Sequence, residues 1–130
     1  MGNTISKMPK RRKLAISALQ MATKRSIVDG ILEADITEVW SRIRKLRCDD
    51  GSRVSFTAYI IACYASALMD HPVLRTYQLF PNRLLTFDGV DVSTLIDHPK
   101  ADGIPVPYLI KNAHIKSVQQ ISIELRAAVE

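Results

Sequence analysis

The sequence has 130 residues, 47% of them hydrophobic and 24% charged, with a formal net charge of +5. These values are typical of one globular domain with its own core, and the sequence shows neither a low-complexity segment nor a disulfide framework. Cys48 and Cys63 lack the spacing of a metal or redox motif, and the three histidines are scattered, so we expect no metal site. We recognise no secretory signal and no membrane-spanning segment, and we therefore expect a cytoplasmic protein that does not bind membranes.

The N-terminal region is basic, and we expect residues 1–8 to form a flexible tail ahead of a single domain over residues 9–130. Met1–Ser6 fit the short myristoylation pattern loosely, and whether Gly2 is native stays open. A basic segment suits nucleic acid, a membrane surface or cofactor phosphates, or is simply a solvated helix face. No aromatic residue interleaves with these charges, so we do not expect base stacking on nucleic acid. The charges are Lys7, Lys10, Arg11, Arg12, Lys13, Lys24 and Arg25.

Three elements are predicted before residue 53. A helix is expected from Pro9 to about Lys24, and a strand rich in branched residues over 26–36. Thr37 is expected to cap a second helix that ends near Arg47, because threonine side chains accept first-turn N–H groups. Asp49–Ser52 carries a turn signal.

The most apolar stretch predicts a central helix from Ser55, a good N-cap, to Asp70, ahead of His71-Pro72. A helix that is apolar nearly all round is buried, and this one is too short to cross a bilayer. We therefore expect it to form the core. Its main apolar face is predicted to hold Phe56, Tyr59, Ile60, Tyr64 and Leu68, continued by Ile61, Ala62, Ala65 and Met69.

The C-terminal half predicts a short extended piece, three strands and a helix. Residues 73–79 are expected to be extended, and residues 83–87 and 90–96 to form a hairpin around Asp88-Gly89. Residues 104–110 contain two prolines and predict an edge or irregular strand. Ser117 is expected to cap a last helix with an inner stripe of Val118, Ile121, Leu125 and Val129. This order predicts an α/β (α+β) two-layer sandwich with a mixed, largely antiparallel sheet.

Several runs occur in a characteristic order. Ile31–Thr37, Val54–Leu68 and His71-Pro72 come first, and Phe87–Val92, Ile104–Pro107 and Lys116-Ser117 follow. Over about residues 9–130, this series resembles the catalytic domain of the acyltransferase component of 2-oxoacid dehydrogenase complexes. It is also similar to the first half of chloramphenicol acetyltransferase, which shares that fold. The resemblance implies a chloramphenicol acetyltransferase-like half domain.

The resemblance implies transfer of an acyl group between coenzyme A and a thiol or hydroxyl at a trimer interface, with a histidine as base on the incoming thiol or hydroxyl. Coenzyme A or acyl-coenzyme A is then the expected cofactor. The expected partner is a further copy of the chain, in a homotrimer, or a second chain with the complementary half. The family carries its histidine in an H-x-x-x-D-G signature near the end of a longer domain. We therefore expect the catalytic half to be missing and the chain to be inactive alone. No lipoyl-carrying or subunit-binding segment is recognised.

Few residues are candidates for the site, and none is assigned as catalytic. His98 and Asp102 spell H-x-x-x-D-G, but the resemblance places them in a loop between strands, and we interpret the match as a coincidence. By resemblance, Arg12 is a site-supporting candidate that pairs with the signature aspartate of another subunit or chain. Ser93 and Thr94 are substrate-channel candidates, and the register decides which faces inward. His71 and His114 are interpreted as structural, beside helix ends.

Two alternatives to an acyltransferase stay open. A half domain exposes strand edges and apolar surface, so the chain is alternatively a non-catalytic assembly or partner-binding module. A third interpretation assigns the basic N-terminal segment to nucleic acid, with an affinity that falls steeply with salt.

Overall fold

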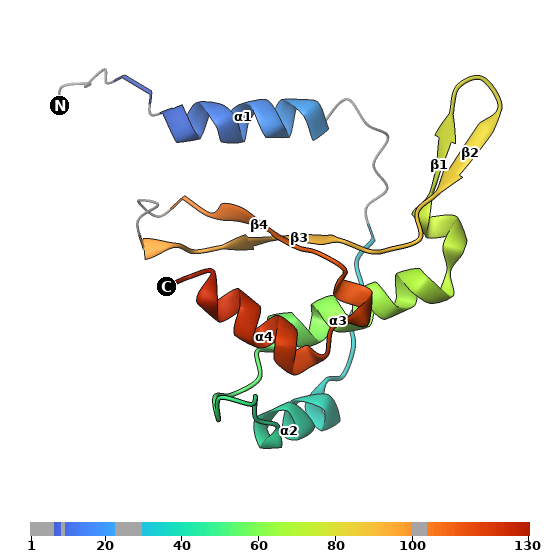
Figure 1. The fold of residues 1–130 in the computed structure, drawn as a ribbon. Helices are drawn as coiled ribbons and strands as arrows, with labels where there is room; N and C mark the ends of the chain where they lie inside the picture. Colours follow the sequence, from blue (N-terminus) through green and yellow to red (C-terminus); the bar gives the residue numbers. More distant parts are fainter. Residues whose placement is uncertain (1–6, 9, 23–29, 100–103) are drawn as a thin grey trace. The chain divides into compact units, whose positions relative to one another are not determined.

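The computed structural model describes residues 7–8, 10–22, 30–99 and 104–130. The chain divides into two compact units, residues 1–34 and 35–130, which are described separately. The first contains α1, Lys10–Ala22 (Figure 1), within the range predicted for the first helix. The side chains of Ile16 and Leu19 are exposed. The predicted ends of this helix, Pro9 and 23–24, lie outside the described residues, as do Gly2 and most of the predicted tail.

The strand predicted over 26–36 is wrong for residues 30–36, which are irregular. Ile31 and Leu32 are 101% and 96% exposed. Branched residues favour a strand when they pack on neighbouring strands, and no described strand pairs with this segment. Residues 26–29 lie outside the described part.

The second unit begins with α2, Thr37–Lys45, whose buried residue is Ile43. Thr37 does not cap it as predicted. Instead, the Asp35 carboxylate accepts hydrogen bonds from the Thr37 N–H (2.9 Å) and hydroxyl (2.6 Å). An aspartate side chain commonly accepts the backbone N–H two residues later, and here this bond also engages the Thr37 hydroxyl that we expected to cap the helix. The turn predicted over 49–52 is confirmed: Gly51 has a φ of 77° and donates its N–H to the Cys48 carbonyl.

The central helix, α3 (Phe56–Asp70), has its predicted ends. The Ser55 hydroxyl accepts the Ala58 N–H at 3.4 Å, and His71 follows the last turn. Its predicted all-round burial is wrong, because the buried side is formed by Ala58, Ile61 and Ala65. Ile60 and Tyr64, which we placed on the main apolar face, are 48% and 56% exposed. Ala58 and Ala65 allow close helix packing on the buried side, and Ile60 and Tyr64 face outward.

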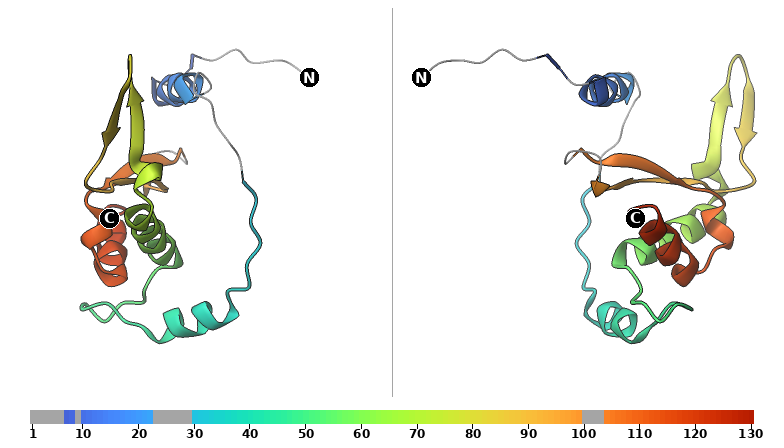
Figure 2. Two further views of the ribbon diagram at one scale, coloured as in Figure 1. Left: turned by 90° about the vertical axis from the view of Figure 1, so that its right-hand side faces the viewer. Right: turned by 60° about the vertical axis from the view of Figure 1, so that its left-hand side comes forward.

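The core lies between α3, α4 (Val118–Ala127) and a pair of strands, β3 (Val92–Ile96) and β4 (Val106–Ile110). The three views agree that β3 and β4 form a layer over the two helices (Figures 1 and 2). Ile110 and Ile121 are fully buried at the centre. Ser117 caps α4 as predicted, in a capping box with Gln120.

The strands form two antiparallel pairs. β1 (Thr76–Leu79) pairs with β2 (Arg83–Thr86), and β3 pairs with β4. The predicted hairpin between 83–87 and 90–96 is therefore wrong, and the predicted extended segment starts only at Thr76, after a 3-10 helix over Pro72–Arg75. β4 has one partner in the described sheet, as expected for an edge strand with Pro107.

The hairpin prediction fails because the residues around Gly89 cross from one strand pair to the other. The Val90 carbonyl accepts the Ala113 N–H at 2.8 Å, and the Val90 N–H donates to His114 Nδ1 at 3.1 Å. These two bonds tie residue 90 to the start of the next 3-10 helix, Ala113–Ile115, rather than to β2.

Candidate functional site

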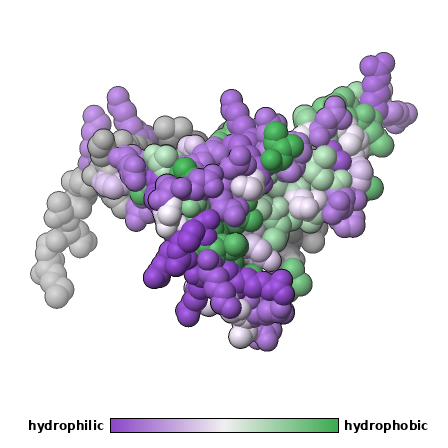
Figure 3. Space-filling view, turned by 60° about the horizontal axis from the view of Figure 1, so that its bottom comes forward, coloured by the Kyte–Doolittle hydropathy of each residue, from purple (hydrophilic) through white to green (hydrophobic). Residues whose placement is uncertain are grey.

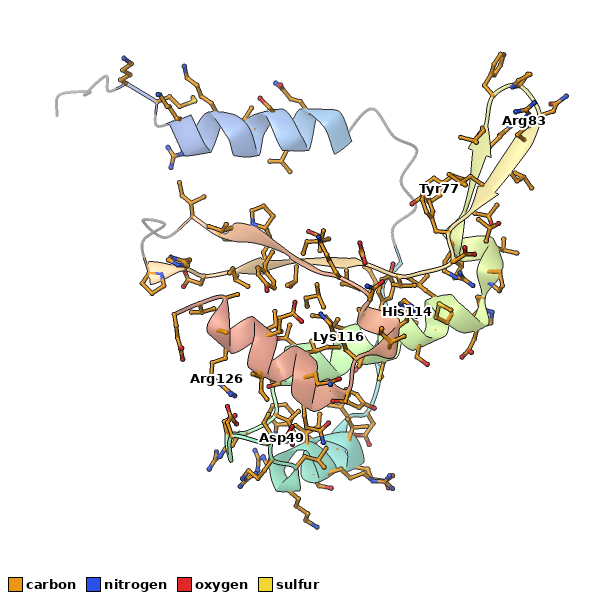
Figure 4. All side chains as sticks on the ribbon, viewed as in Figure 1. Asp49, Tyr77, Arg83, His114, Lys116 and Arg126 are labelled. Carbon is orange, nitrogen blue, oxygen red and sulfur yellow. The ribbon has the colours of Figure 1, made fainter. Side chains whose placement is uncertain are left out.

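An open groove of about 370 Å³ lies where the C-terminal half of α3 meets the base of the β1–β2 hairpin. Its apolar walls come from Leu68 and Leu74 and from the rings of Tyr77 and Phe87. The two rings pack edge to face with 5.6 Å between centroids. The groove combines apolar walls with a few polar groups, which is typical of small-molecule sites. Figure 4 labels Tyr77 beside the hairpin base.

Arg75 fixes one wall of the groove. Its Nε donates to the Leu68 carbonyl at 2.7 Å, its Nη2 to the Met69 carbonyl at 3.3 Å, and its Nη1 to the Phe87 carbonyl. The guanidinium therefore satisfies carbonyls of the last turn of α3, where the helix dipole favours a cation. It also holds the segment that leads to β3.

The floor of the groove is the crossover of residues 89–91. The Asp91 carboxylate accepts the Asn112 N–H at 2.7 Å, and Asn112 has the left-handed φ of 51°. His114 lies on the other side, and its Nδ1 is a hydrogen-bond acceptor for Val90. A Cβ atom at Gly89 would lie 3.2 Å from His114 Cε1. The glycine thus makes room for the imidazole.

The register of β3 separates the two channel candidates. Thr94 lies opposite Tyr108 and is half-buried, on the side of Val92 and Ile96 that packs on the core. Ser93 lies opposite Leu109 and is exposed, on the other face with Leu95. The structure therefore does not bring Ser93 and Thr94 to one surface.

The other candidates are placed as follows. Arg12 lies on α1 of the first unit with its side chain exposed. His98 is half-buried just after β3, and Asp102 lies outside the described residues. His71 is exposed at the C-terminal end of α3.

A polar network missed by the sequence analysis joins β4 to α4. The Tyr108 hydroxyl donates to Glu124 Oε1 at 3.3 Å, and Lys116 Nζ lies 2.5 Å from Glu124 Oε2. Burial, and then the adjacent Glu124 carboxylate, raise the pKa of Tyr108. Tyr108 is half-buried in β4, and nothing in the sequence pattern indicated Glu124 as its partner.

In the described part of the chain, no group of three or more His, Cys, Asp or Glu side chains is arranged to hold a metal ion. Over the same residues, no helix is long and apolar enough to cross a membrane.

Comparison with known proteins covers nearly the whole chain. The family model described as "2-oxoacid dehydrogenases acyltransferase (catalytic domain)" matches residues 2–130. A dihydrolipoyllysine-residue acetyltransferase component of pyruvate dehydrogenase complex, from Staphylococcus epidermidis strain RP62A, is 27% identical over 128 residues. The same component from strain ATCC 12228 is equally similar. The alignments cover 94% of this chain, which spans 29% of the length of these relatives.

Solved structures share the fold. A probable dihydrolipoamide acetyltransferase from Listeria monocytogenes has a TM-score of 0.79 at 21% identity, covering 98% of this chain and 55% of its own. A truncated catalytic core of the 2-oxoacid dehydrogenase multienzyme complex from Thermoplasma acidophilum has a TM-score of 0.76 at 21% identity, and the match covers 96% of this chain and 57% of that one. The cubic core of the pyruvate dehydrogenase multienzyme complex has a TM-score of 0.76 at 19% identity, and the match covers 97% of this chain and 54% of that one. These likenesses confirm the predicted fold class.

Proposed function

The chain belongs to the family of 2-oxoacid dehydrogenase acyltransferase catalytic domains, and on that premise we propose that it forms the N-terminal half of a coenzyme A-dependent acyltransferase domain. In the proposed reaction, an acyl group passes between coenzyme A and a thiol such as dihydrolipoyl, or a hydroxyl. The observation that carries the proposal is the family match over residues 2–130. The 55% share of the Listeria chain that is covered supports the assignment to part of a domain.

The chemistry requires a base. It takes the proton of the acceptor thiol, the thiolate attacks the acyl carbonyl carbon, and the carbon–sulfur bond to coenzyme A breaks, so that coenzyme A leaves and takes up a proton. Among the described residues that line the groove there is no histidine or cysteine, and Arg75 donates to three carbonyls. We infer that the base comes from residues beyond this stretch, on the same polypeptide or on another.

The chain's own contribution is then binding and orientation. The exposed hydroxyl of Ser93 is the stronger substrate-channel candidate, because that of Thr94 lies on the face packed against the core. Arg12 keeps its proposed role of pairing with an aspartate of another subunit or chain. Coenzyme A or acyl-coenzyme A is the proposed cofactor, with no metal.

The proposed partner is a second copy, in a trimer by resemblance, or a chain with the complementary half. The solved cubic core is described as part of a multienzyme complex, which supports an oligomeric assembly. Exposed apolar side chains on the second unit, among them Phe80 at 96%, also support a partner surface. A cytoplasmic location is part of the proposal, and the free thiols of Cys48 and Cys63 support it.

The same exposed side chains favour the alternative of a non-catalytic assembly module of this fold. Leu79 and Leu84 of the β1–β2 hairpin are 44% and 74% exposed. A two-stranded hairpin is marginally stable by itself, so a partner that covers it would stabilise it. The assembly module and the enzyme differ in whether coenzyme A binds.

The test is an acyl-transfer assay with acetyl-coenzyme A and dihydrolipoamide. The purified chain should show no turnover, and turnover should appear when the rest of a family domain is supplied as a second polypeptide. Turnover by the chain alone that is lost in His98→Ala would overturn the assignment of the base to residues outside it. An unchanged His98→Ala variant in the completed domain is the matching control.

A further inference from the structure

Four cations lie at the C-terminal end of α2 and on the two sides of the turn that follows it. We refer to Arg44, Lys45, Arg47 and Arg53 as the basic cluster. The ion pairs found among the described residues involve Arg42, Lys116 and Arg126, and no member of the basic cluster takes part in one. All four side chains are exposed, and Figure 3 shows hydrophilic residues gathered over the face that carries α2.

Arg47 and Arg53 lie directly opposite each other in an isolated antiparallel bridge. Like charges directly opposite on paired strands repel each other. Other bonds hold the geometry in place: Arg47 Nη1 donates to the Arg44 and Leu46 carbonyls at 2.7 and 2.8 Å, and the Arg53 carbonyl accepts Arg126 Nη2 at 2.8 Å. The bridge therefore places two arginines, neither of which forms an ion pair among the described residues, at facing positions across a turn that also contains Asp49 and Asp50. An anion bound beside the two arginines would reduce their repulsion.

An apolar groove of about 300 Å³ lies beside the basic cluster. Its apolar lining comes from Val39, Ile43 and Leu46 of the α2 region and from Tyr59 of α3. Glu38 and Arg42 also line it, and they form an ion pair with each other at 2.5 Å. Leu46 is 41% exposed and sits in sequence between two members of the basic cluster, Lys45 and Arg47. A short segment of bound chain can therefore reach the apolar lining and the cations at the same time.

We propose that this end of α2 docks an acidic segment of a partner protein, with carboxylates on the basic cluster and an aliphatic side chain in the groove. Because the basic cluster is positive, it favours a negatively charged partner segment. The Val39, Ile43 and Leu46 side chains that line the groove favour an aliphatic side chain. A nucleic acid fits less well, because the exposed aromatic ring nearby is already engaged. Arg44 lies 5.6 Å from the centroid of the Trp40 ring, and Phe56 packs edge to face with Trp40 with 5.2 Å between the ring centroids.

Fluorescence anisotropy on the purified chain in about 50 mM salt tests the proposal, because electrostatic contacts are strong there. The probe is a labelled peptide of aspartate, glutamate and leucine. A second peptide replaces each leucine with serine at the same charge, and an oligothymidylate of equal charge tests for general polyanion binding. We expect the leucine peptide to bind most tightly and both others to bind at least several times more weakly.

Two sets of variants locate the site. Arg47→Glu/Arg53→Glu should weaken binding of the leucine peptide about tenfold, the effect of losing two close charge pairs. Leu46→Ser should lower the affinity for the leucine peptide toward the affinity for the serine peptide. The matched control Arg83→Glu/Lys111→Glu makes the same charge change at two other exposed positions, the hairpin and the end of β4. It should weaken binding no more than about twofold by lowering the net charge.

Several results would overturn the proposal. One is no binding of the leucine peptide by a chain whose circular dichroism and cooperative melting show that it is folded. Another is equal binding of the oligothymidylate, which would indicate a general polyanion surface. A third is an equal loss in the control pair, which would indicate net charge alone. A fourth is an unchanged affinity of the Leu46→Ser variant for the leucine peptide, which would show that the groove takes no part in binding.

Discussion

The hydroxyl of Ser122 accepts a hydrogen bond from the backbone N–H of Ser55 at 2.9 Å. Ser122 is only 1% exposed, in the middle of α4, and Ser55 is the N-cap of α3. The bond therefore joins the start of the central helix to a helix 67 positions later in the chain. It satisfies an N–H group that the packing of the two helices hides from water.

Ser122→Ala tests this bond. The substitution leaves the Ser55 N–H without its partner, and we expect the free energy of unfolding to fall by about 1–2 kcal/mol. Urea unfolding monitored by circular dichroism measures it. The control is Ser66→Ala on the exposed side of α3, where alanine is the better helix former and stability should be unchanged or slightly higher. Equal effects of the two substitutions would show that the bond does not matter.

Gly89→Ala tests the crossover beside the groove. The added methyl meets the His114 ring at 3.2 Å, so the ring or the backbone must shift, and we expect a loss of about 1–3 kcal/mol. Gly30→Ala is the control, because nothing lies within 4 Å of its Cβ position. Adding His114→Ala to Gly89→Ala should recover part of the loss in a double-mutant cycle. Purely additive losses would argue against this contact.

Arg75→Met tests the wall of the groove. The substitution keeps most of the aliphatic stem but removes the bonds to Leu68, Met69 and Phe87, and we expect a loss of about 2–3 kcal/mol in thermal or urea unfolding. Arg83→Met, at an exposed position of β2, should change stability by no more than about 0.5 kcal/mol. If Arg75→Met unfolds like the wild type, the guanidinium does not hold the groove together.

The acid side of the stability profile depends on Asp50. The Ser52 hydroxyl, then the Ser52 N–H, and more weakly the charge of Arg126, lower the pKa of Asp50 below its ordinary value of 3.8. A carboxyl whose folded-state pKa is lowered stabilises the fold above its unfolded pKa, and this stability is lost as the pH falls through the folded value. Asp50→Asn should therefore unfold with a shallower pH dependence below about pH 4.

Asp49→Asn makes the same charge change at the neighbouring, exposed position and is the control for Asp50→Asn. Thermal unfolding between about pH 2 and 6 spans the ordinary range of carboxyl titration. Identical slopes for Asp50→Asn and the wild type would show that Asp50 contributes nothing to acid unfolding.

Much of the local structure could be predicted from the sequence because it depends on near neighbours. The caps at Ser55 and Ser117 and the turn at Gly51 each involve groups within three residues. The order of motifs was enough to predict the family. The apolar stripe of α4 indicated Ile121 and Leu125, which are buried.

Strand pairing and burial could not be predicted in the same way, because they depend on distant partners. Asp88-Gly89 looks like a hairpin loop until the Val90 bonds to Ala113 and His114 are known. Ile31 and Leu32 read as strand residues, yet no described strand pairs with them. Arg75 and Ser122 act through distant backbone groups, and no spacing rule indicates such contacts. Which of Ser93 and Thr94 faces inward required the register of β3.

The most direct test of the proposed function is thermal unfolding of the purified chain with and without millimolar coenzyme A. A ligand that binds only the folded state stabilises it by about 2.7 kcal/mol at a hundredfold excess over Kd, which is a rise in Tm of several degrees for a domain of this size. Adenosine 3′,5′-bisphosphate at the same concentration separates binding of the nucleotide part from binding of the pantetheine arm. We predict a clear rise with coenzyme A. A cooperative transition at an unchanged Tm would contradict a coenzyme A site on these residues and would favour the assembly module.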